Sequence, residues 1–378
     1  MLLWEARLRW KAINTKLKEK GGKENGAIST VGSPSSSRYE RFVEVGQAFT
    51  FVVRNSLRQL EDLPDNTIIF AYDTGALEVF EWCRERGFRC VLGQMDPGRV
   101  EIELVREEEK CWPGWATCVT ELPEEYSRRR EREWALADRI VVNSEFCREA
   151  LVRQGVQTEK LVVIPLAFEM EDEAEVRGQR TEDRGQKSVV SGQWSVVSGP
   201  QSSTLRVLFL GQVILRKGIQ YLVEAARKLE KESVHFDIVG PIGISQKATA
   251  SAPRNMTFHG PVSRDGTAGW YRKADLFILP TLSDGFALTQ LEALAHGLPV
   301  IATPNCARVV EEGKTGFIIP PRDPQALAEA ILRFVRNPGL GWEMAPTCRD
   351  AVKTYSIDAY GRRLVESFGN NKLHSSTK

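Results

Sequence analysis

Two acidic side chains in the second half of the chain, Asp284 and Glu292, are eight positions apart in LSDGFALTQLEALAHG (282–297). The pattern is that of a loop leading into an apolar helix, in which Glu292 lies roughly 7–8 Å past the helix start. Helical side chains lean toward the N-terminus, so this carboxylate points back toward the loop. A diphosphate at the helix start and ribose hydroxyls on Glu292 would fit the spacing. On spacing alone, a solvated acid on an exposed helix face is the commoner case.

The same loop offers backbone groups that suit an anion. Gly285 allows close approach of the backbone to a ligand. The first N–H groups of a helix have no intrahelical partner, and the helix dipole favours a phosphate beside them. In this stretch they belong to Phe286, Ala287 and Leu288.

Two basic side chains, Arg216 and Lys217, follow another strand-like run in LFLGQVILRKG (208–218). The strand pattern ends at Gly211, and the basic pair opens the next helix pattern. A lysine in this position can meet a phosphate as a point charge. A surface basic pair is an equally common explanation when the feature is taken alone. Both loops connect a strand to a helix in one domain, so they can face one site.

The elements that position these loops alternate between strand and helix patterns along the chain. Near-continuous apolar runs separated by amphipathic stretches are typical of buried parallel strands, and they predict an α/β protein with two Rossmann-like, doubly wound domains facing a cleft. Ligands of such sheets bind at the carboxyl ends of the strands. Strand patterns lie at 67–72, 88–93, 139–144, 161–168, 205–211, 235–240, 255–260, 275–280, 299–303 and 316–320, and helix patterns lie near 75–86, 123–137, 217–231, 264–273 and 286–296. A further helix pattern begins at Glu145, and helix patterns follow the last strand to about residue 369.

Composition narrows the class of protein. A chain of 378 residues exceeds one ordinary core, and 51 basic against 50 acidic residues give no reason to expect a nucleic-acid partner. We see no apolar run long enough to span a membrane, and the opening MLLWEARLRWKAINTKLKEK has no apolar core of a secretion signal. Seven scattered cysteines without a C-x-x-C pair indicate reduced thiols in a cytoplasmic protein and argue against structural zinc.

Residues 169–204 differ from the rest of the chain. They are rich in Ser, Gly and Gln, and SVVSGQ at 188–193 returns as SVVSGP at 195–200. This imperfect repeat has no helical or strand period and predicts a flexible, dispensable linker. Pairing of the two SVV triplets as strands is the less favoured alternative.

Three segments resemble the retaining glycosyltransferases of the GT-B fold, the group 1 or family 4 class. They are GQVILRKGIQYLVEAARKL (211–229), YRKADLFILPTLSDGFALTQLEALAHGLPVIAT (271–303) and EEGKTGFIIPPRDPQALAEAI (311–331). ALADRIVVNSEFCREALVRQGV (135–156) is similar to the family segment that precedes the crossing between domains. Order and spacing agree over about 150 residues, and the strand–loop–helix context agrees as well, so the resemblance is specific.

The resemblance implies a hexosyltransferase-type enzyme that moves a sugar from a nucleoside-diphosphate sugar with retention of configuration. The family's E-x7-E pair falls on Asp284 and Glu292, which implies contacts to sugar hydroxyls and to the ribose. Lys217 and Arg216 would hold the leaving diphosphate. No D-x-D motif occurs, so neither metal nor cofactor is expected. The further donor-binding positions that the resemblance implies are Gly211, Gln212, Gly240, Pro241, Gly285, Phe286, Ala287 and Leu288.

Some positions depart from the family pattern. Asp284 stands where the family usually has Glu, and Gln212 stands where it often has Arg, although Arg216 can supply that charge. Gly21-Gly22 follows a basic helix-like segment where the family has a strand. Only about four strand patterns precede the linker at 169–204. The N-terminal domain is therefore predicted to be abbreviated, the alternative being that the true start lies upstream.

The resemblance divides the chain into four parts: an acceptor-side domain (1–168) with 1–37 poorly structured or helical at an interface, a linker (169–204), a donor-binding domain (205–345), and a C-terminal helix and tail (346–378). The acceptor is an unknown glycan, lipid or small molecule. Asp73 and Asp96 follow N-domain strands and are weaker candidates for acceptor contact, because turn formation or helix capping is the commoner role of such residues.

The apolar residues at 3, 10, 13 and 17 are interleaved with Arg and Lys and would suit a peripheral helix on the inner membrane face. A helix packed on the N-terminal domain is the favoured alternative. Two rivals to a transferase stay open. One is a catalytically silent sugar-nucleotide-binding or partner protein with a shortened acceptor domain, and the other is a nucleotide-sugar epimerase of the same fold.

Overall fold

The computed structural model describes residues 38–59, 63–121, 124–169 and 204–369. The predicted N-terminal helix, the predicted loop at 21–37 and the repeats of the linker at 169–204 lie outside the described residues. The chain forms two compact units, of which the first comprises Met1–Leu92 and Glu121–Asp138, and the second Gly93–Thr120 and Arg139–Lys378. Residues before the predicted boundary at 168 thus contribute to the second unit.

The first unit contains three helices that pack against one another. The helices are α2 (Arg38–Arg58), α3 (Leu77–Arg84) and α5 (Glu124–Leu136), and each packs against the other two. The described residues before the insert contain four strands, β1 (Ile68–Tyr72), β2 (Arg89–Gln94), β3 (Arg139–Val142) and β4 (Leu161–Val163), in the order β1-β2-β3-β4. This agrees with the four strand patterns that the sequence predicted there. The division between the units falls within β2.

The second unit is built on a six-stranded sheet in the order β10-β9-β8-β5-β6-β7, and every pair within it is parallel. The chain starts in the middle with β5, continues to one side through β6 and β7, and then crosses to β8 beside β5. Ligands of open parallel sheets bind at such a switch in strand order. The strands are β5 (Leu205–Leu210), β6 (Val234–Val239), β7 (Met256–Gly260), β8 (Leu276–Leu279), β9 (Val300–Ala302) and β10 (Gly316–Ile318).

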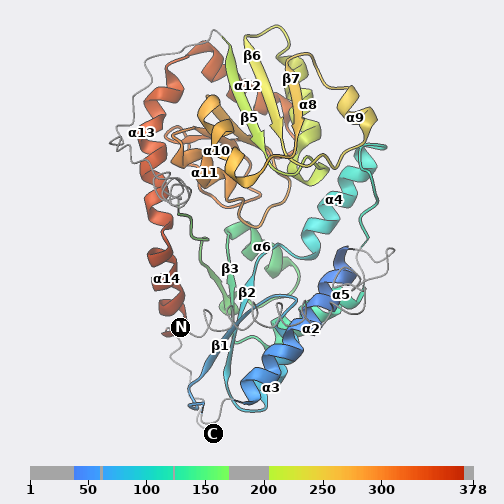
Figure 1. The fold of residues 1–378 in the computed structure, drawn as a ribbon, viewed down its shortest axis with the longest axis vertical. Coiled ribbons are helices and arrows are strands. Elements are labelled where there is room, and N and C mark those ends of the chain that lie inside the picture. The colour runs from blue at the N-terminus through green and yellow to red at the C-terminus, as the bar shows by residue number, and fades with distance from the viewer. Residues whose placement is uncertain (1–37, 60–62, 122–123, 170–203, 370–378) are drawn as a thin grey trace, which may run out of the picture. The chain divides into compact units, whose positions relative to one another are not determined.

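Helices cover both faces of this sheet (Figure 1), as a doubly wound fold requires. α8 and α12 pack against each other, and so do α11 and α13. The strands read as continuous apolar runs because both faces are buried, and every residue of β8 is buried. The helices are α6 (Glu145–Arg153), α8 (Ile219–Lys228), α9 (Gln246–Ala250), α10 (Arg264–Lys273), α11 (Thr289–Ala295), α12 (Pro324–Arg336), α13 (Leu340–Val352) and α14 (Ile357–Gly369).

Three described α-helices have no counterpart in the sequence predictions: α2, the short α9, and α4 (Arg99–Cys111). The buried positions of α4 are Val100, Ile102 and Glu108. A buried face that includes a glutamate does not give the apolar period by which helices are recognised in a sequence. This helix belongs to the second unit, where it contacts the turn that carries Arg216 and Lys217.

Candidate donor-binding site

The two candidate loops meet at the switch point of the six-stranded sheet. The loop after β5 ends in a single 3-10 turn, Leu215–Lys217, and Gly218 then adopts a left-handed conformation with φ 73° before α8. A Cβ at this glycine would lie 1.9 Å from the carbonyl oxygen of Pro280, at the end of β8. Gly218 is therefore needed for the close approach of the two loops.

The predicted basic and acidic residues are in direct contact. Lys217 forms an ion pair with Asp284, 67 positions away, and each side chain is 14% exposed. The backbone N–H of Asp284 donates to the carbonyl of Asn305 (2.9 Å), and the Asn305 side-chain amide donates to the carbonyl of Leu282 (2.8 Å). The loop that carries Asp284 (281–288, called the acidic loop) is thus held by Asn305, in the loop that follows β9. These hydrogen bonds fix the position of the Asp284 backbone.

Arg216 is held against the same loop. Its Nη1 donates to the carbonyl of Ser283 (2.8 Å), and its own carbonyl accepts from the N–H of Leu282 (2.9 Å). Its guanidinium also lies 3.5 Å from the carboxylate of Glu101, on α4. The Ser283 hydroxyl donates to that carboxylate (2.9 Å). Sequence reasoning missed Glu101, because it lies on a helix that was not predicted.

Burial raises the pKa of Glu101, and the neighbouring carboxylates Asp96 and Asp284 act in the same direction. The Arg216 guanidinium and the hydrogen bond from Ser283 act in the opposite direction. Because the upward effects prevail, the charged form of this carboxylate is less stable here than in water.

Glu292 is the fourth residue of α11, and its carboxylate has a buried partner. The Tyr271 hydroxyl donates to Oε2 (2.6 Å), and the Tyr271 ring, which is 1% exposed, stacks on His296 at 5.0 Å. Burial raises the pKa of Tyr271, and Glu292 adds to this, so the hydroxyl stays protonated as a donor. The fully solvated glutamate that was the commoner case on spacing alone does not describe this side chain. Sequence reasoning missed Tyr271, although it opens the second of the three family-like segments.

The helix after the acidic loop starts later than predicted. α11 begins at Thr289 and has seven residues, whereas the sequence placed the start at Phe286. Ala287 adopts a left-handed conformation with φ 63°, and Leu288 precedes the helix as its N-cap. The expectation that Phe286, Ala287 and Leu288 contribute the first N–H groups of the helix is therefore wrong, because the backbone turns at Ala287 before it becomes helical.

The structure explains the glycine at position 285 differently from the sequence prediction, which assigned it to close approach of a ligand. A Cβ there would lie 2.0 Å from the carbonyl oxygen of Met95 and 3.0 Å from the side-chain amide of Asn143. That amide also donates to the Met95 carbonyl (2.8 Å). The small residue is required for packing of the loop against the chain itself, so close approach of a ligand is not needed to explain it.

The remaining predicted positions lie at the ends of β5 and β6. A Cβ at Gly240 would lie 1.9 Å from the carbonyl oxygen of Gly211, so these two strand ends are in close contact. The carbonyl of Pro241 accepts from the N–H of Val213 (2.9 Å). Gln212 and Pro241 are exposed at this edge of the sheet.

Asp73 and Asp96, the two weaker candidates for contact with the acceptor, interact with other residues of the protein. The carboxylate of Asp96 accepts from the N–H of Gly98 (2.7 Å), which is turn formation. Asp73 pairs with Arg130 (3.2 Å), and both side chains are buried. Turn formation, one of the roles that the sequence favoured, accounts for Asp96. The ion pair with Arg130 gives Asp73 a structural role that the sequence did not predict.

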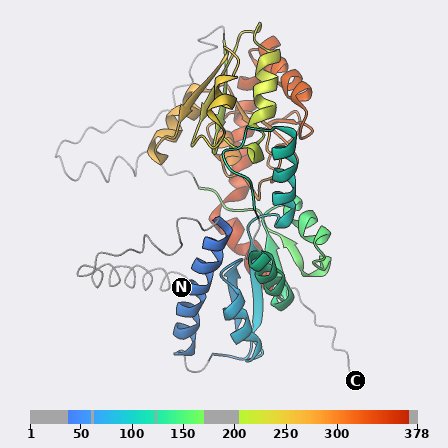
Figure 2. The ribbon, with the colours of Figure 1, turned by 90° about the vertical axis from the view of Figure 1, so that its right-hand side faces the viewer.

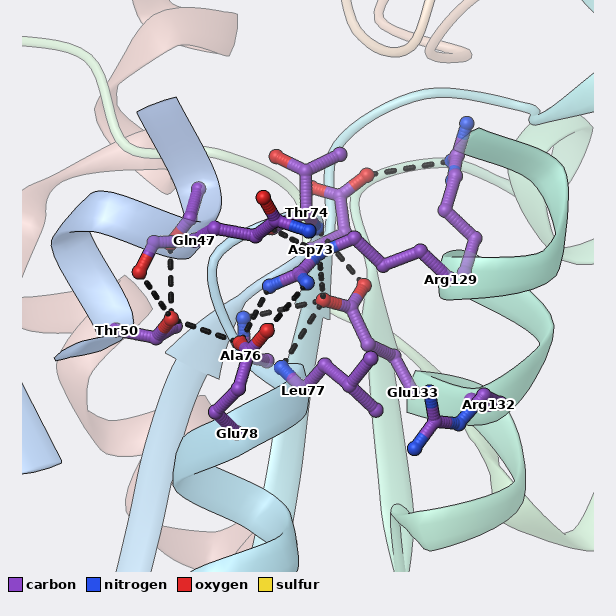
Figure 3. A network of polar contacts seen from close by, with 12 residues as sticks. Gln47, Thr50, Asp73, Thr74, Ala76, Leu77, Glu78, Arg129, Arg132 and Glu133 are labelled. Carbon is purple, nitrogen blue, oxygen red and sulfur yellow. Dashed lines mark hydrogen bonds and ion pairs between the residues drawn. The ribbon is translucent and has the colours of Figure 1, made fainter. Parts of the chain in front are cut away.

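Asp73 belongs to a buried polar network in the first unit, which Figure 3 shows from close by. Glu133 on α5 has a side chain with 0% exposure, and its carboxylate accepts from the N–H groups of Thr74 (2.8 Å), Ala76 (3.1 Å) and Leu77 (3.1 Å). Thr74 has φ 64°, an uncommon conformation for a β-branched residue. The network holds the loop after β1 in this conformation.

Within the described ranges, we find no group of three or more His, Cys, Asp or Glu side chains that could hold a metal ion. Among the helices of those ranges, none has the length and apolar character to cross a membrane.

Comparison with known sequences points to one family for part of the chain. Residues 204–337 match the family model described as glycosyl transferases group 1. The chain is 26% identical over 203 residues to the D-inositol 3-phosphate glycosyltransferase of Streptomyces avermitilis, a match that covers 45% of this chain and 44% of the relative. The enzyme of the same name from Streptomyces griseus is 31% identical over 131 residues, 30% of this chain and 28% of the relative. The matches thus span less than half the length of these relatives.

Solved structures with the same fold include sucrose-phosphate synthase from Thermosynechococcus elongatus, with TM-score 0.61 and 19% identity over 90% of this chain and 81% of that one. HepE of Anabaena in complex with UDP has TM-score 0.59 and 15% identity, covering 86% of this chain and 82% of that one. Similarity at this level of identity establishes the fold, which is the GT-B fold with α/β, Rossmann-like units.

Proposed function

We propose that this protein is a retaining glycosyltransferase of the family 4 class that moves a sugar from a nucleoside-diphosphate sugar to an acceptor. The observation that carries the proposal is the contact between Lys217 and Asp284 at the switch point of the parallel sheet, with Arg216 bound to the same loop. The family-model match at 204–337 includes all three residues, and the relatives named above are glycosyltransferases.

The two cations suit the leaving group of the reaction. When the bond between the sugar carbon and the diphosphate breaks, negative charge develops on the diphosphate, and preorganised positive groups stabilise that charge. Lys217 and Arg216 occupy this role, because both are held by the acidic loop before a ligand arrives. Asp284 is the acceptor for sugar hydroxyls. The acceptor hydroxyl attacks the sugar carbon as the bond from that carbon to the diphosphate breaks, and the hydroxyl proton passes to the leaving phosphate. No metal or cofactor is proposed for these steps, because the chain has no D-x-D motif.

Glu292 is the proposed acceptor for the ribose hydroxyls. The Tyr271 hydroxyl satisfies one of its oxygens (2.6 Å), which fixes the direction of the carboxylate and leaves further acceptor capacity for a diol. Because HepE was solved with UDP, uridine nucleotides are the first to test. The acceptor is a glycan, a lipid or a small molecule, and the protein is proposed to act in the cytoplasm, with peripheral contact to the inner membrane face as a further proposal.

Glu292→Ala is expected to weaken binding of the nucleoside diphosphate by about 1.5–3 kcal/mol, because the ribose hydroxyls lose a charged acceptor. Tyr271→Phe is expected to cost about 1 kcal/mol, because the ring still packs on His296 and only the hydrogen bond to Glu292 is lost. Isothermal titration with UDP, GDP and ADP measures both. A folded Glu292→Ala protein with unchanged affinity for all nucleotides that the wild type binds would refute the ribose role.

The test of the proposed activity is hydrolysis of nucleotide sugars without an acceptor. Purified protein is incubated with UDP-, GDP- and ADP-linked hexoses after a thermal-shift screen has ranked them. Slow release of nucleoside diphosphate, abolished in Lys217→Ala, is the expected result. Binding without turnover, with a broad acceptor panel included, would favour the catalytically silent sugar-nucleotide-binding protein instead.

A further inference from the structure

The helix α4 brings two carboxylates, seven positions apart, onto the donor-binding unit. Glu101 contacts Arg216 and Ser283, as described above. Glu108, with 0% exposure of its side chain, accepts from Gln220 Nε2 (2.8 Å), the Tyr221 hydroxyl (2.7 Å) and Arg322 Nε (2.6 Å). In both views of the fold α4 lies beside α8 (Figure 1, Figure 2), which agrees with these contacts.

The two carboxylates differ in what their partners do. The partners of Glu108 are not among the candidate donor-binding residues, so this residue serves to attach the helix. Glu101 lies 3.5 Å from a guanidinium that the proposed mechanism assigns to the diphosphate. Its hydrogen bond from the Ser283 hydroxyl is shorter, at 2.9 Å, so a second contact besides that with Arg216 holds the carboxylate in place.

Each cation of the candidate site therefore has a carboxylate partner, Lys217 with Asp284 and Arg216 with Glu101. Asp284 has a proposed role toward sugar hydroxyls, whereas Glu101 has no role in the reaction as proposed. A diphosphate bound at Arg216 would lie close to the Glu101 carboxylate, and like charges at short range in a partly buried site repel each other strongly.

We propose that Glu101 is the counter-anion of Arg216 and that it limits how tightly the site holds the diphosphate. The inference rests on the proposed function, because it requires that Arg216 binds the diphosphate. The groups that face Glu101 are Arg216, Ser283, Asp96 and Asp284. Asp96 and Asp284 add negative potential, so Arg216 is the one cation among these four residues.

This arrangement has a consequence for product release. The nucleoside diphosphate first carries the proton that it took from the acceptor. Because the second ionisation of a terminal phosphate has a pKa of about 6, this proton is lost at pH 8, and the product then carries more negative charge than the sugar nucleotide from which it came. A fixed carboxylate beside the phosphate site therefore weakens binding of the nucleoside diphosphate more than binding of the sugar nucleotide. It thus favours release of the nucleoside diphosphate after transfer.

The experiment measures binding of UDP, GDP, ADP and inorganic pyrophosphate by isothermal titration at pH 8, with the wild type, Glu101→Gln and Glu108→Gln. Glutamine is close in size to glutamate, and its side-chain oxygen can still accept from Ser283, so Glu101→Gln removes the charge and keeps the loop. Glu101→Gln is expected to bind the preferred diphosphate about tenfold more tightly than the wild type, because charged groups at short range couple this strongly. Glu108→Gln is expected to bind like the wild type, with a lower melting temperature.

Equal or weaker binding by Glu101→Gln would overturn the inference, and so would an equal change in both variants, which would mean that the carboxylates only attach α4. Arg216→Ala distinguishes failure of the counter-anion role of Glu101 from failure of the proposed diphosphate site. If the wild type binds a diphosphate, Arg216→Ala weakens it and Glu101→Gln leaves it unchanged, then only the counter-anion role fails. If the wild type binds none of the four probes, the proposed function fails, and the counter-anion role fails with it.

Discussion

Replacing Lys217 with alanine is expected to lower turnover of the sugar nucleotide by about a hundredfold or more, while affinity for the donor falls less. The physical reason is that the leaving diphosphate gains charge in the transition state, so a cation that contacts it contributes more there than in the ground state. Lys217 is suited to this role because its ion pair with Asp284 fixes its position before the donor binds. Initial rates of donor hydrolysis and titration of binding give the two quantities.

Several variants make this result interpretable. Lys228→Ala removes an exposed lysine at the end of α8 and is expected to match the wild type. Arg216→Ala and the double variant are measured alongside, because Arg216 can cover part of the loss. Thermal melting checks that Asp284 without its partner does not unfold the loop. Equal losses in turnover and in affinity would mean that Lys217 only binds the donor.

Glu133→Ala is expected to produce the largest loss of stability, lowering the free energy of unfolding by about 3–5 kcal/mol, because each buried N–H group left without an acceptor costs about 1–3 kcal/mol. The variant leaves three backbone N–H groups without their acceptor, at Thr74, Ala76 and Leu77. It also removes the carboxylate 3.7 Å from Arg129, whose side chain is 2% exposed. Arg129 keeps its ion pair with Glu78 (2.6 Å), so the charge is not left uncompensated. Equilibrium unfolding in urea measures the change.

Glu131→Ala is the matched control, because Glu131 is exposed on the same helix and should change stability by no more than about 0.5 kcal/mol. Glu133→Gln keeps an acceptor for the loop and is expected to lie between the two. If Glu133→Ala were as stable as Glu131→Ala, the network would not hold the loop after β1, and the φ of 64° at Thr74 would need another cause.

The α/β fold could be predicted because it depends on patterns that are local in the sequence. A strand buried on both faces must be apolar at nearly every position. The runs IVV within RIVVNS and LFIL within DLFILP show this without any knowledge of their neighbours. Both became strands, β3 and β8. For the same reason the loops after β5 and β8 could be assigned to the carboxyl ends of strands.

The sequence could also indicate the residue types of the site, since a basic pair and two acids in such loops suit a nucleoside diphosphate sugar. It could not determine the helix start. Apolar spacing continues through Phe286 and Leu288, whereas the left-handed backbone at Ala287 delays α11 to Thr289. That conformation accompanies packing of the loop against Met95, which is remote in the sequence.

What only the tertiary structure decided is which of these residues touch one another. The contact between Lys217 and Asp284 depends on β8 pairing with β5, and strand order is not encoded in the pattern of either strand. The roles of Glu101 and Glu133 could not be predicted from the sequence for a related reason. A buried carboxylate is stable only when distant groups supply its hydrogen bonds and counter-charges, and in a sequence it looks like any solvated acid on a helix.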